Sequence, residues 1–369
     1  MINADIKVTV IMPIYNESDY LAPALDSVID QTLKNIEIIC VDDGSTDGSL
    51  DIIKEYQKND SRIRIVTETN AGPALARNNG IKRARGKYLA FLDADDFYAP
   101  TLLEELYTEA ERLELDITIA NYDIYNSKKA TFEKVAPVEH EHIYEPGKVT
   151  SKNDYPDYIF TSTNGAAWNK LFRTSFVIEK QLSFIQDVKM YEDVYFTITA
   201  LSLAERVGKV HKILLHHRVY SEQSRAKMFR KHYEQIPYIY SEIKKFLMHN
   251  GMYSPLSRSY LNFTASRLFK IYNMIGFDLK DNLWNILHSE YVEVFDWQNH
   301  TADEFDSAEV CDFVANVVIY DYKQYKRRLS RRGPVADEKL GKNMKNAKKK
   351  RRVRAFFAKL FGKKTAQTK

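Results

Sequence analysis

The chain has 369 residues, of which 44% are hydrophobic and 28% charged, with 24 Tyr and 19 Phe. This composition excludes disorder as the overall class, because it supplies enough apolar side chains for packed cores. The formal net charge of +4 averages two unlike parts: residues 323–369 hold 19 basic and 2 acidic residues, a charge of +17, and residues 1–322 hold 35 basic and 48 acidic residues, a charge of −13. The sequence therefore predicts a mildly acidic body with a strongly basic tail.

Three further features bear on compartment and size. Cys40 and Cys311 lie too far apart for a metal-ligand pair, and so few cysteines suit a reducing compartment. No run of about 18 apolar residues could span a membrane, and the N-terminus lacks the segments of a secretion signal. We expect a cytosolic protein, and the length favours more than one domain.

The first 120 residues alternate β-rich runs with amphipathic helices. The predicted strands are Lys7–Met12, Ile36–Val41, Ile63–Thr67, Tyr88–Leu92 and Ile117–Ala120. Helices are predicted after a cap at Ser18 or Asp19, from about Gly48, from about Pro73 to Ala84, and from Pro100 in the first turn of a fourth. Strict alternation of strand and helix predicts an α/β fold with a mostly parallel, Rossmann-like sheet flanked by helices.

The pattern changes twice after residue 120. Residues 121–165 show no steady period, and we expect loops and short strands that cover the sheet edge. From about Met228 the apolar spacing becomes helical, which predicts a C-terminal helical domain. The expected division is residues 1–225, residues 226–330, and a basic tail of residues 331–369.

Polar turns follow the first four predicted strands, where ligands of such sheets bind. These turns are Pro13–Glu17, Asp42–Ser45, Asn70–Pro73 and Asp93–Asp96. Neither the Gly-x-Gly-x-x-Gly dinucleotide fingerprint nor a phosphate-binding P-loop is present. A nucleotide site here must therefore work with carboxylates.

Asp93 and Asp95 are spaced so that both side chains share one face of an extended chain. Such hard oxygen ligands suit Mg²⁺ or Mn²⁺, with substrate phosphates and water completing the shell. The alternative is a capped turn before the helix near Pro100.

Four segments resemble, in order and spacing, the nucleotide-sugar half of the family 2 glycosyltransferases, which have the GT-A fold. They are Val10–Glu17, Val41–Asp47, Asn70–Gly80 and Gly86–Asp96. The later segments Trp168–Phe172 and Tyr191–Phe196 extend the resemblance, which covers roughly residues 6 to 225 and then fades.

The resemblance implies how the donor nucleotide is held. Tyr15 would stack on the base, Asp43 would accept a hydrogen bond from the uracil imide, and the backbone at Pro13 would form the pocket wall. Asn70 and Arg77 would reach the nucleotide from the third strand end and the following helix. The alternatives are a core aromatic for Tyr15, a turn cap for Asp43 and a solvated helix charge for Arg77.

The same resemblance implies a metal-bound diphosphate. Asp93 would contact the ribose or sugar, and Asp95 would ligate the divalent ion that bridges the diphosphate. Such an ion neutralises the charge on the departing nucleoside diphosphate.

A later loop would close over that diphosphate. Arg218 has the planar fork of donors that suits phosphate oxygens, and Ser224 follows six residues later. This loop departs from the family pattern, in which an aromatic often stands at the position of His217. Whether His216, His217 or Glu222 completes the metal site therefore stays open.

Asp193 and Glu192 are the predicted catalytic pair. Inverting members use the Asp of this pair as general base, because a sugar hydroxyl attacks well only as its proton is removed. Glu192 would orient Asp193 or the acceptor, and helix capping is the alternative for both. Trp168 and Lys170 would line the acceptor side, with burial of Trp168 in the core as the alternative.

The basic tail carries an apolar stripe at helical spacing: Val353, Phe356, Phe357, Leu360 and Phe361. A basic helix with such a stripe is typical of binding to an anionic membrane surface. An acidic partner protein is an alternative. Nucleic acid is disfavoured, because the body is acidic and no recognition motif accompanies the basic run.

The sequence thus predicts a metal-dependent inverting glycosyltransferase on the inner face of the cell membrane. It would move a sugar from a UDP-sugar to a glycan or lipid-linked acceptor in surface polysaccharide synthesis, with its oligomeric state left open. The rival functions are a sugar nucleotidyltransferase and a non-catalytic scaffold recruited to the membrane.

Overall fold

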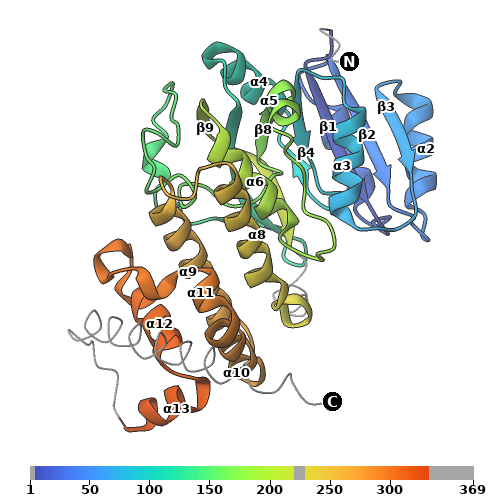
Figure 1. Cartoon of the computed structure of the whole chain (residues 1–369). Helices are drawn as coiled ribbons and strands as arrows, with labels where there is room; N and C mark the ends of the chain where they lie inside the picture. The colour runs from blue at the N-terminus through green and yellow to red at the C-terminus, as the bar shows by residue number, and fades with distance from the viewer. Residues whose placement is uncertain (1–4, 220–228, 332–369) are drawn as a thin grey trace, which may run out of the picture. The chain divides into compact units, whose positions relative to one another are not determined.

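The computed structural model describes residues 5–219 and 229–331, which divide into two compact units (Figure 1). The first unit consists of the described residues up to 219 together with Lys245–Ser259. The second consists of residues 229–244 and the described residues from Tyr260 onward. The predictions for Ser224, for Glu222 and for the basic tail after residue 331 lie outside the described residues.

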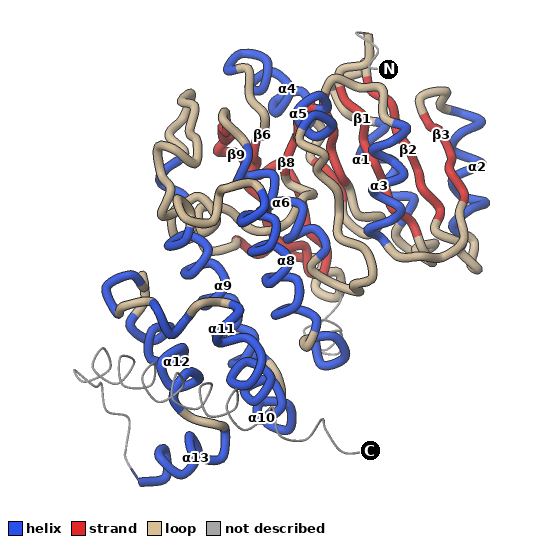
Figure 2. The backbone as a smooth tube through the Cα atoms, in the orientation of Figure 1, coloured by secondary structure: helices blue, strands red, loops and turns tan. Residues whose placement is uncertain are grey.

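The first unit contains a sheet of nine strands in the order β3-β2-β1-β4-β8-β6-β9-β5, with β7 beside β6 (Figure 2). The strands are β1 (Val8–Ile14), β2 (Ile36–Asp42), β3 (Ile63–Thr67), β4 (Tyr88–Phe91), β5 (Phe97–Tyr98), β6 (Ile117–Asn126), β7 (Thr131–Lys134), β8 (Lys170–Arg173) and β9 (Val207–Val219).

The expectation of a mostly parallel sheet needs correction beyond the fourth strand. β3, β2, β1 and β4 are parallel, as predicted. β8 then pairs antiparallel with β4 and with β6, β9 runs parallel to β6, and β5 and β7 pair antiparallel with β9 and β6. The reason is that antiparallel neighbours need no crossover helix, and the chain between β6 and β8 is largely loop.

Helices cover both faces of the parallel strands, so the α/β fold class is confirmed. They are α1 (Leu21–Ile29), α2 (Ser49–Asn59), α3 (Pro73–Arg83) and α4 (Leu102–Leu113). Val8, Val10 and Met12 of β1 share one core with α1, α2 and α4. The intervening Ile11 meets α3 on the other face, so closely that a Cβ on Gly80 would lie 2.4 Å from the Ile11 side chain. α3 lies across β1 and β2 in Figure 1.

Two predicted helix starts are wrong. The residue that caps α1 is Tyr20, without a side-chain hydrogen bond, so neither Ser18 nor Asp19 is the cap. Glu17 instead accepts hydrogen bonds through its backbone oxygen from the first turn, including one of 2.9 Å from the Leu21 N–H. α4 begins at Leu102, so Pro100 precedes the helix rather than lying in its first turn.

The later part of the first unit is built on strands that the sequence pattern did not reveal. β6 continues to Asn126 instead of ending at Ala120, and β8 and β9 were not predicted. The short helix α5 (Thr174–Glu179) follows β8, and α6 (Glu192–Leu203) begins at the predicted acidic pair.

The second unit is helical, as expected for this part of the chain. Two helices contribute to both units: α8 (Gln235–His249) and α9 (Ser257–Met274). The chain then continues through α10 (Phe277–Ile286), the π-helical turn Leu287–Tyr291, α11 (Val292–Val294), α12 (Ala308–Ile319) and α13 (Tyr322–Arg331). Short 3₁₀ turns lie at Glu141–Ile143 in the first unit and at Trp297–Asn299 and Ala302–Glu304 in the second unit. Its core includes Trp284, stacked on Tyr325 at 4.1 Å and edge-on to Phe313. No helix in the described part of the chain is long and apolar enough to cross a membrane.

Candidate active site

Hydrogen bonds that involve side chains join the loops after β1 and β2. Asn16 donates its N–H to the Ser45 hydroxyl at 3.1 Å, and the Asn16 side-chain oxygen accepts from the Thr46 N–H at 2.8 Å. Asn16 has a φ of 56°, in the left-handed region that Asn tolerates better than most residues. Tyr15 lies at this junction with 47% of its surface exposed, so its ring is accessible for stacking. Pro13 precedes it in β1, opposite Val41 of β2.

Asp43 joins the loops after β2 and β3. Its two carboxylate oxygens accept the backbone N–H groups of Ala71 and Gly72, each at 2.8 Å, and the residue is buried. Gly44 has a φ of +73°, and a Cβ there would lie 2.9 Å from the Asn70 nitrogen, so the turn requires glycine. Asn70 is exposed at this edge. Each Asp43 oxygen retains a lone pair that could accept a further hydrogen bond.

The turn after β4 concentrates carboxylates, of which Asp96 is fully buried and Asp93 and Asp95 are partly buried. Burial raises the pKa of Asp95 to about 8, and the neighbouring negative charges of Asp96, Asp93 and Glu17 add to the effect. The pKa of Glu17 is likewise raised to about 7 by burial and by surrounding carboxylates, first among them Asp93. This excess of hard oxygen ligands over positive charge is the donor set that a divalent cation prefers. The residues present therefore fit a metal ion.

Arg77 bridges two of the acidic residues. Its guanidinium donates to Asp93 at 2.5 Å and to Glu192 at 2.7 Å, and its side chain is only 6% exposed. It also lies over the Phe184 ring at 5.3 Å. Burial opposes the charge, but the two carboxylates outweigh it and raise the pKa of Arg77. The prediction put Arg77 against the nucleotide; in the structure it links α3, the turn after β4 and α6.

Asp193 lies in the first turn of α6. The residue that precedes this helix, Tyr191, has a left-handed φ of 64°. Burial raises the pKa of Asp193 to about 7, as does the charge of Glu192, while Arg77 partly offsets the shift. A carboxylate poised near neutral pH is suited to accept a proton from a hydroxyl.

Asp96 anchors β9 to the same site. It is fully buried and accepts from His217 Nδ1 at 3.0 Å and from the Arg218 N–H at 2.7 Å. Arg218 donates through Nε to the Asp95 backbone oxygen at 2.7 Å. His217 stacks on Trp168 with ring centroids 5.2 Å apart. Burial opposes the positive charge of His217, but the Asp96 carboxylate outweighs burial, so the pKa of His217 is raised.

The three candidates for a further metal ligand, His216, His217 and Glu222, differ in where they lie relative to the carboxylate cluster. His217 lies beside Asp96 and the carboxylate cluster. His216 instead bonds Asp123 at 2.6 Å and packs against Phe97, because successive residues of a strand face opposite sides. Glu222 is outside the described residues.

The two predicted acceptor residues differ in their surroundings. Trp168 is partly buried, between His217 and Tyr122, whose ring meets it edge-on at 4.7 Å. Lys170 is 1% exposed, and its ammonium donates to oxygens of Asn164, Ala166 and Asn169. The Lys170 ammonium therefore fastens the loop that carries Trp168 instead of facing solvent.

Two residues of the site had no assigned role in the sequence analysis. Asp96 directly follows Asp95, so its place in the same acidic turn could have marked it as a site residue. Glu17 was part of the first matching segment, but only its contact with the other carboxylates marks it as a site residue.

Comparison with known proteins identifies relatives of this chain. A family model described as glycosyl transferase family 2 matches residues 9–175. EpsH of Bacillus subtilis (strain 168), which is assigned to the glycosyltransferases, is 33% identical over 247 residues, covering 66% of this chain and 70% of EpsH. The poly(ribitol-phosphate) beta-glucosyltransferase of Bacillus spizizenii (strain ATCC 23059 / NRRL B-14472 / W23) is 32% identical over 209 residues, 55% of this chain but only 30% of that protein.

The fold has a counterpart among solved structures. S. aureus TarS 1-349 in complex with UDP-GlcNAc superposes with a TM-score of 0.64 over 94% of this chain and 92% of that one, at 19% identity. With the match to EpsH and the carboxylate site at the strand ends, these findings lead to one conclusion: the chain belongs to the family 2 glycosyltransferases and is a glycosyltransferase.

Proposed function

We propose that this glycosyltransferase moves a sugar from a UDP-sugar, with inversion and with the help of a divalent metal ion, to a hydroxyl of a glycan or lipid-linked acceptor. The observation that carries the proposal is the joining of four strand ends, α6 and β9 into one carboxylate site. Cell-surface polysaccharide synthesis is the process in which we place it, in line with the poly(ribitol-phosphate) beta-glucosyltransferase relative.

In this proposal the donor base lies in the first three loops. Tyr15 stacks on the base, Asp43 accepts a hydrogen bond from the uracil imide, and Asn70 and the backbone at Pro13 complete the pocket. The exposure of Tyr15 and the spare lone pairs of Asp43 support these roles. The choice of uracil follows the TarS complex with UDP-GlcNAc, which shares the fold.

The diphosphate and metal belong to the turn after β4. Asp95 holds the ion, His217 is the further candidate ligand, and Asp93 contacts the ribose or sugar. When bound, Mn²⁺ or Mg²⁺ neutralises charge on the departing nucleoside diphosphate. Arg218, held by Asp95 and Asp96, contacts the phosphates, and Ser224 follows it.

Asp193 acts as the general base in this proposal. Its raised pKa lets it take the proton of an acceptor hydroxyl near neutral pH while still being ionised in part. Glu192 and Arg77 form the buried ion pair beside it and position it. Trp168 offers a ring face to the acceptor, and Lys170 positions that ring by bonding its loop.

We place the enzyme on the inner face of the membrane through the basic tail. α13 supports this, because its sequence Tyr322–Arg331 contains Lys and Arg but no acidic residue and leads directly into the tail. Loss of binding to anionic vesicles on removal of residues 342–369 is the expected result, and unchanged binding would refute the membrane role.

The test of the catalytic proposal is a panel of nucleotide sugars with Mn²⁺ or Mg²⁺, scored for UDP release and for transfer. We expect metal-dependent UDP release by the natural chain and little by the Asp95→Ala variant, with Asp193→Asn retaining UDP binding but losing transfer. If no uridine nucleotide binds with metal present, the proposal fails. Release of pyrophosphate from a nucleoside triphosphate and a sugar phosphate would instead indicate a nucleotidyltransferase.

A further inference from the structure

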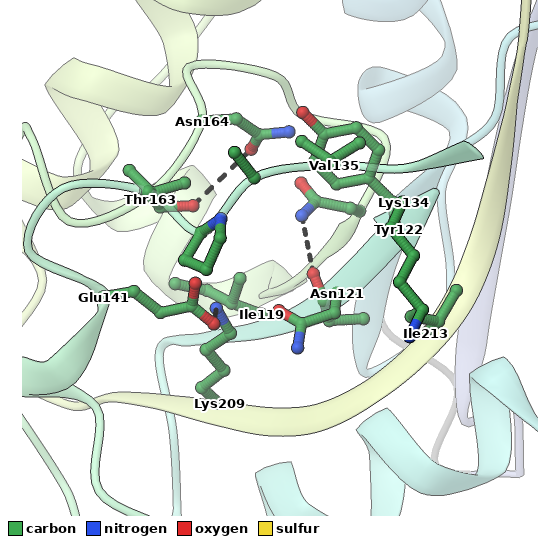
Figure 3. Close-up of a pocket in the computed structure, with 15 residues that line it drawn as sticks. Ile119, Asn121, Tyr122, Lys134, Val135, Glu141, Thr163, Asn164, Lys209 and Ile213 are labelled. Atoms are coloured by element: carbon green, nitrogen blue, oxygen red, sulfur yellow. Dashed lines mark hydrogen bonds and ion pairs between the residues drawn. The ribbon is translucent and has the colours of Figure 1, made fainter. Parts of the chain in front are cut away.

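A cavity of about 160 Å³ opens beside the active site in the first unit (Figure 3). Its walls come from β6, β9, residues 134–141 and residues 163–169. Asn121, Glu141, Asn164 and Lys209 are arranged around it in Figure 3. Of these residues only Asn164 enters the catalytic proposal, as an acceptor for the Lys170 ammonium.

Asn164 lines this cavity, and its side chain holds an unused hydrogen-bond donor that solvent does not reach. Its side-chain oxygen accepts from the Lys170 ammonium at 2.7 Å, and an ammonium can only donate, so the orientation of the amide is settled. The amide nitrogen on the other side is buried and has no hydrogen-bond partner within the described part of the chain. A buried donor without a partner is unfavourable, so a small shift of this side chain that lets a ligand acceptor reach the nitrogen would be favoured.

The remaining lining suits an uncharged, hydroxylated ligand. Lys209 and Glu141 form an ion pair of 2.5 Å across the wall, so neither offers a free charge to an anion or a cation. The side chain of Asn121 can both donate and accept, and the apolar side chains of Ile119 and Ile213 also line the cavity. Polar edges with apolar faces are the chemistry of a sugar ring.

The size of the cavity limits the ligand to one ring. A cavity of about 150 Å³ holds a benzene-sized molecule, and the present one has about the same volume. Because it is open on one side, the substituents of a ring can extend out of it. A nucleotide is too large for this space.

The cavity is coupled to the active site through aromatic contacts. Tyr122 lines the cavity and meets Trp168 edge-on, Trp168 stacks on His217, and His217 bonds Asp96. The pairing of β6 with β9 is irregular on both sides of Asn121, where β9 has extra residues. Such bulges redirect side chains beside functional sites, and here the irregularity exposes Asn121 to the cavity.

We propose that this cavity binds one saccharide ring of the acceptor, a ring other than the one whose hydroxyl reacts. The proposal rests on the proposed function in taking the acceptor to be a glycan. The ring is held by the Asn164 amide nitrogen and the Asn121 amide, with its apolar face on Ile213. Trp168 stands between this ring and the reacting hydroxyl, so the enzyme recognises at least two units of its acceptor.

The test uses the full chain and two variants. Asn121→Ala removes an amide that lines the cavity and has no part in the catalytic proposal, and Ile213→Phe adds bulk at a lining side chain that is 42% exposed. Ile178→Phe is the matched control, because Ile178 is 57% exposed on α5 and does not line the cavity. Saturation-transfer NMR measures binding of a panel of methyl glycosides of common hexoses and N-acetylhexosamines, and metal-dependent UDP release is measured in parallel.

We expect at least one glycoside to bind the natural chain and the Ile178→Phe control equally, and to bind each cavity variant about tenfold more weakly, as expected for loss of one hydrogen bond or of access. UDP release should stay within about twofold in all of them. If no glycoside binds, or if binding is the same in the cavity variants, the inference is overturned even when UDP release is intact. Failure of UDP release in the natural chain would contradict the proposed function instead.

Discussion

The site of this glycosyltransferase contains two kinds of acid, which differ in their surroundings. Asp43 receives two backbone N–H groups, which fix the loop after β3. Asp95 and Asp193 are partly buried among other carboxylates, and their pKa values are raised accordingly. Asp43 therefore builds the shape of the site, whereas the raised pKa values of Asp95 and Asp193 show that their negative charge is unfavourable in the folded protein. Burial alone therefore does not identify a catalytic acid, because the groups around the carboxylate decide its pKa.

The largest expected effect is on catalysis by Asp193→Asn. Transfer should fall by about 10²- to 10⁴-fold, because the variant lacks the base that accepts the hydroxyl proton. The Asn side chain has nearly the same shape, so UDP binding should be retained. Initial rates of transfer measure the effect, with Asp51→Asn on the exposed surface of α2 as the control. Transfer within a few-fold of the natural chain would remove Asp193 from the mechanism.

Asp95→Asn is expected to lower transfer by about 10²- to 10³-fold through loss of transition-state charge stabilisation. Without metal and at neutral pH, the variant should unfold at a higher temperature than the natural chain, because Asn removes the cost of protonating Asp95, or of holding its charge beside Asp96 and Asp93, on folding. Addition of Mn²⁺ should raise the melting temperature of the natural chain only, since binding to the folded state stabilises it. Thermal unfolding with and without Mn²⁺ checks both points. An equal shift by Mn²⁺ in the two proteins would show that the ion binds elsewhere.

The pH dependence of activity should follow the ionisation of Asp193. Below pH about 7, where this group is protonated, transfer should fall roughly tenfold for each pH unit, with a plateau above. A profile of kcat/KM against pH measures this, and a flat profile would contradict it.

Stability should have the opposite pH dependence. Since the folded pKa of Asp193 lies above the ordinary value of 3.8, the folded state binds more protons between these pH values. Its contribution to stability is thus fully present below pH about 4 and is lost as the pH rises through about 7. The free energy of unfolding of the natural chain minus that of Asp193→Asn, compared by denaturant titration, should fall across this window.

The smallest expected effect is the loss of stability in Asp43→Ala. Removing the carboxylate leaves two backbone N–H groups without their partner, at a cost of about 1–3 kcal/mol in the free energy of unfolding. This sign is opposite to that expected for Asp95→Asn, so denaturant titration of the two variants tests the comparison directly. A stabilised Asp43→Ala variant would show that the distinction between the two kinds of acid is wrong.

The sequence patterns predicted the parallel half of the sheet well, and the reason lies in their periodicity. β3 was predicted at its observed bounds, and β1, β2 and β4 within two residues of theirs, because buried parallel strands are almost continuous runs of apolar residues between polar turns. The same turns supplied Asp43, Asp93 and Asp95. Residues that follow parallel strands share one edge of the sheet, so the pattern also placed them near each other.

The other half of the sheet had no such signal. β8 has four residues, and β9 changes its exposure at the bulges opposite Asn121, so neither shows a regular period. Lys170 illustrates the consequence. A lysine in a family motif suggested contact with the acceptor, but its burial among oxygens of residues 164–169 depends on a loop conformation that local sequence does not specify.

Local sequence thus determined which residues end the parallel strands, because hydrophobic spacing and turn chemistry act within a few residues. Only the tertiary structure decided which of the acids have raised pKa values, because that depends on groups distant in sequence: Arg77 reaches Glu192, and Asp96 reaches His217. The cavity beside Tyr122 also depends on the tertiary structure, because its walls come together only when β6, β9 and two loops pack against one another.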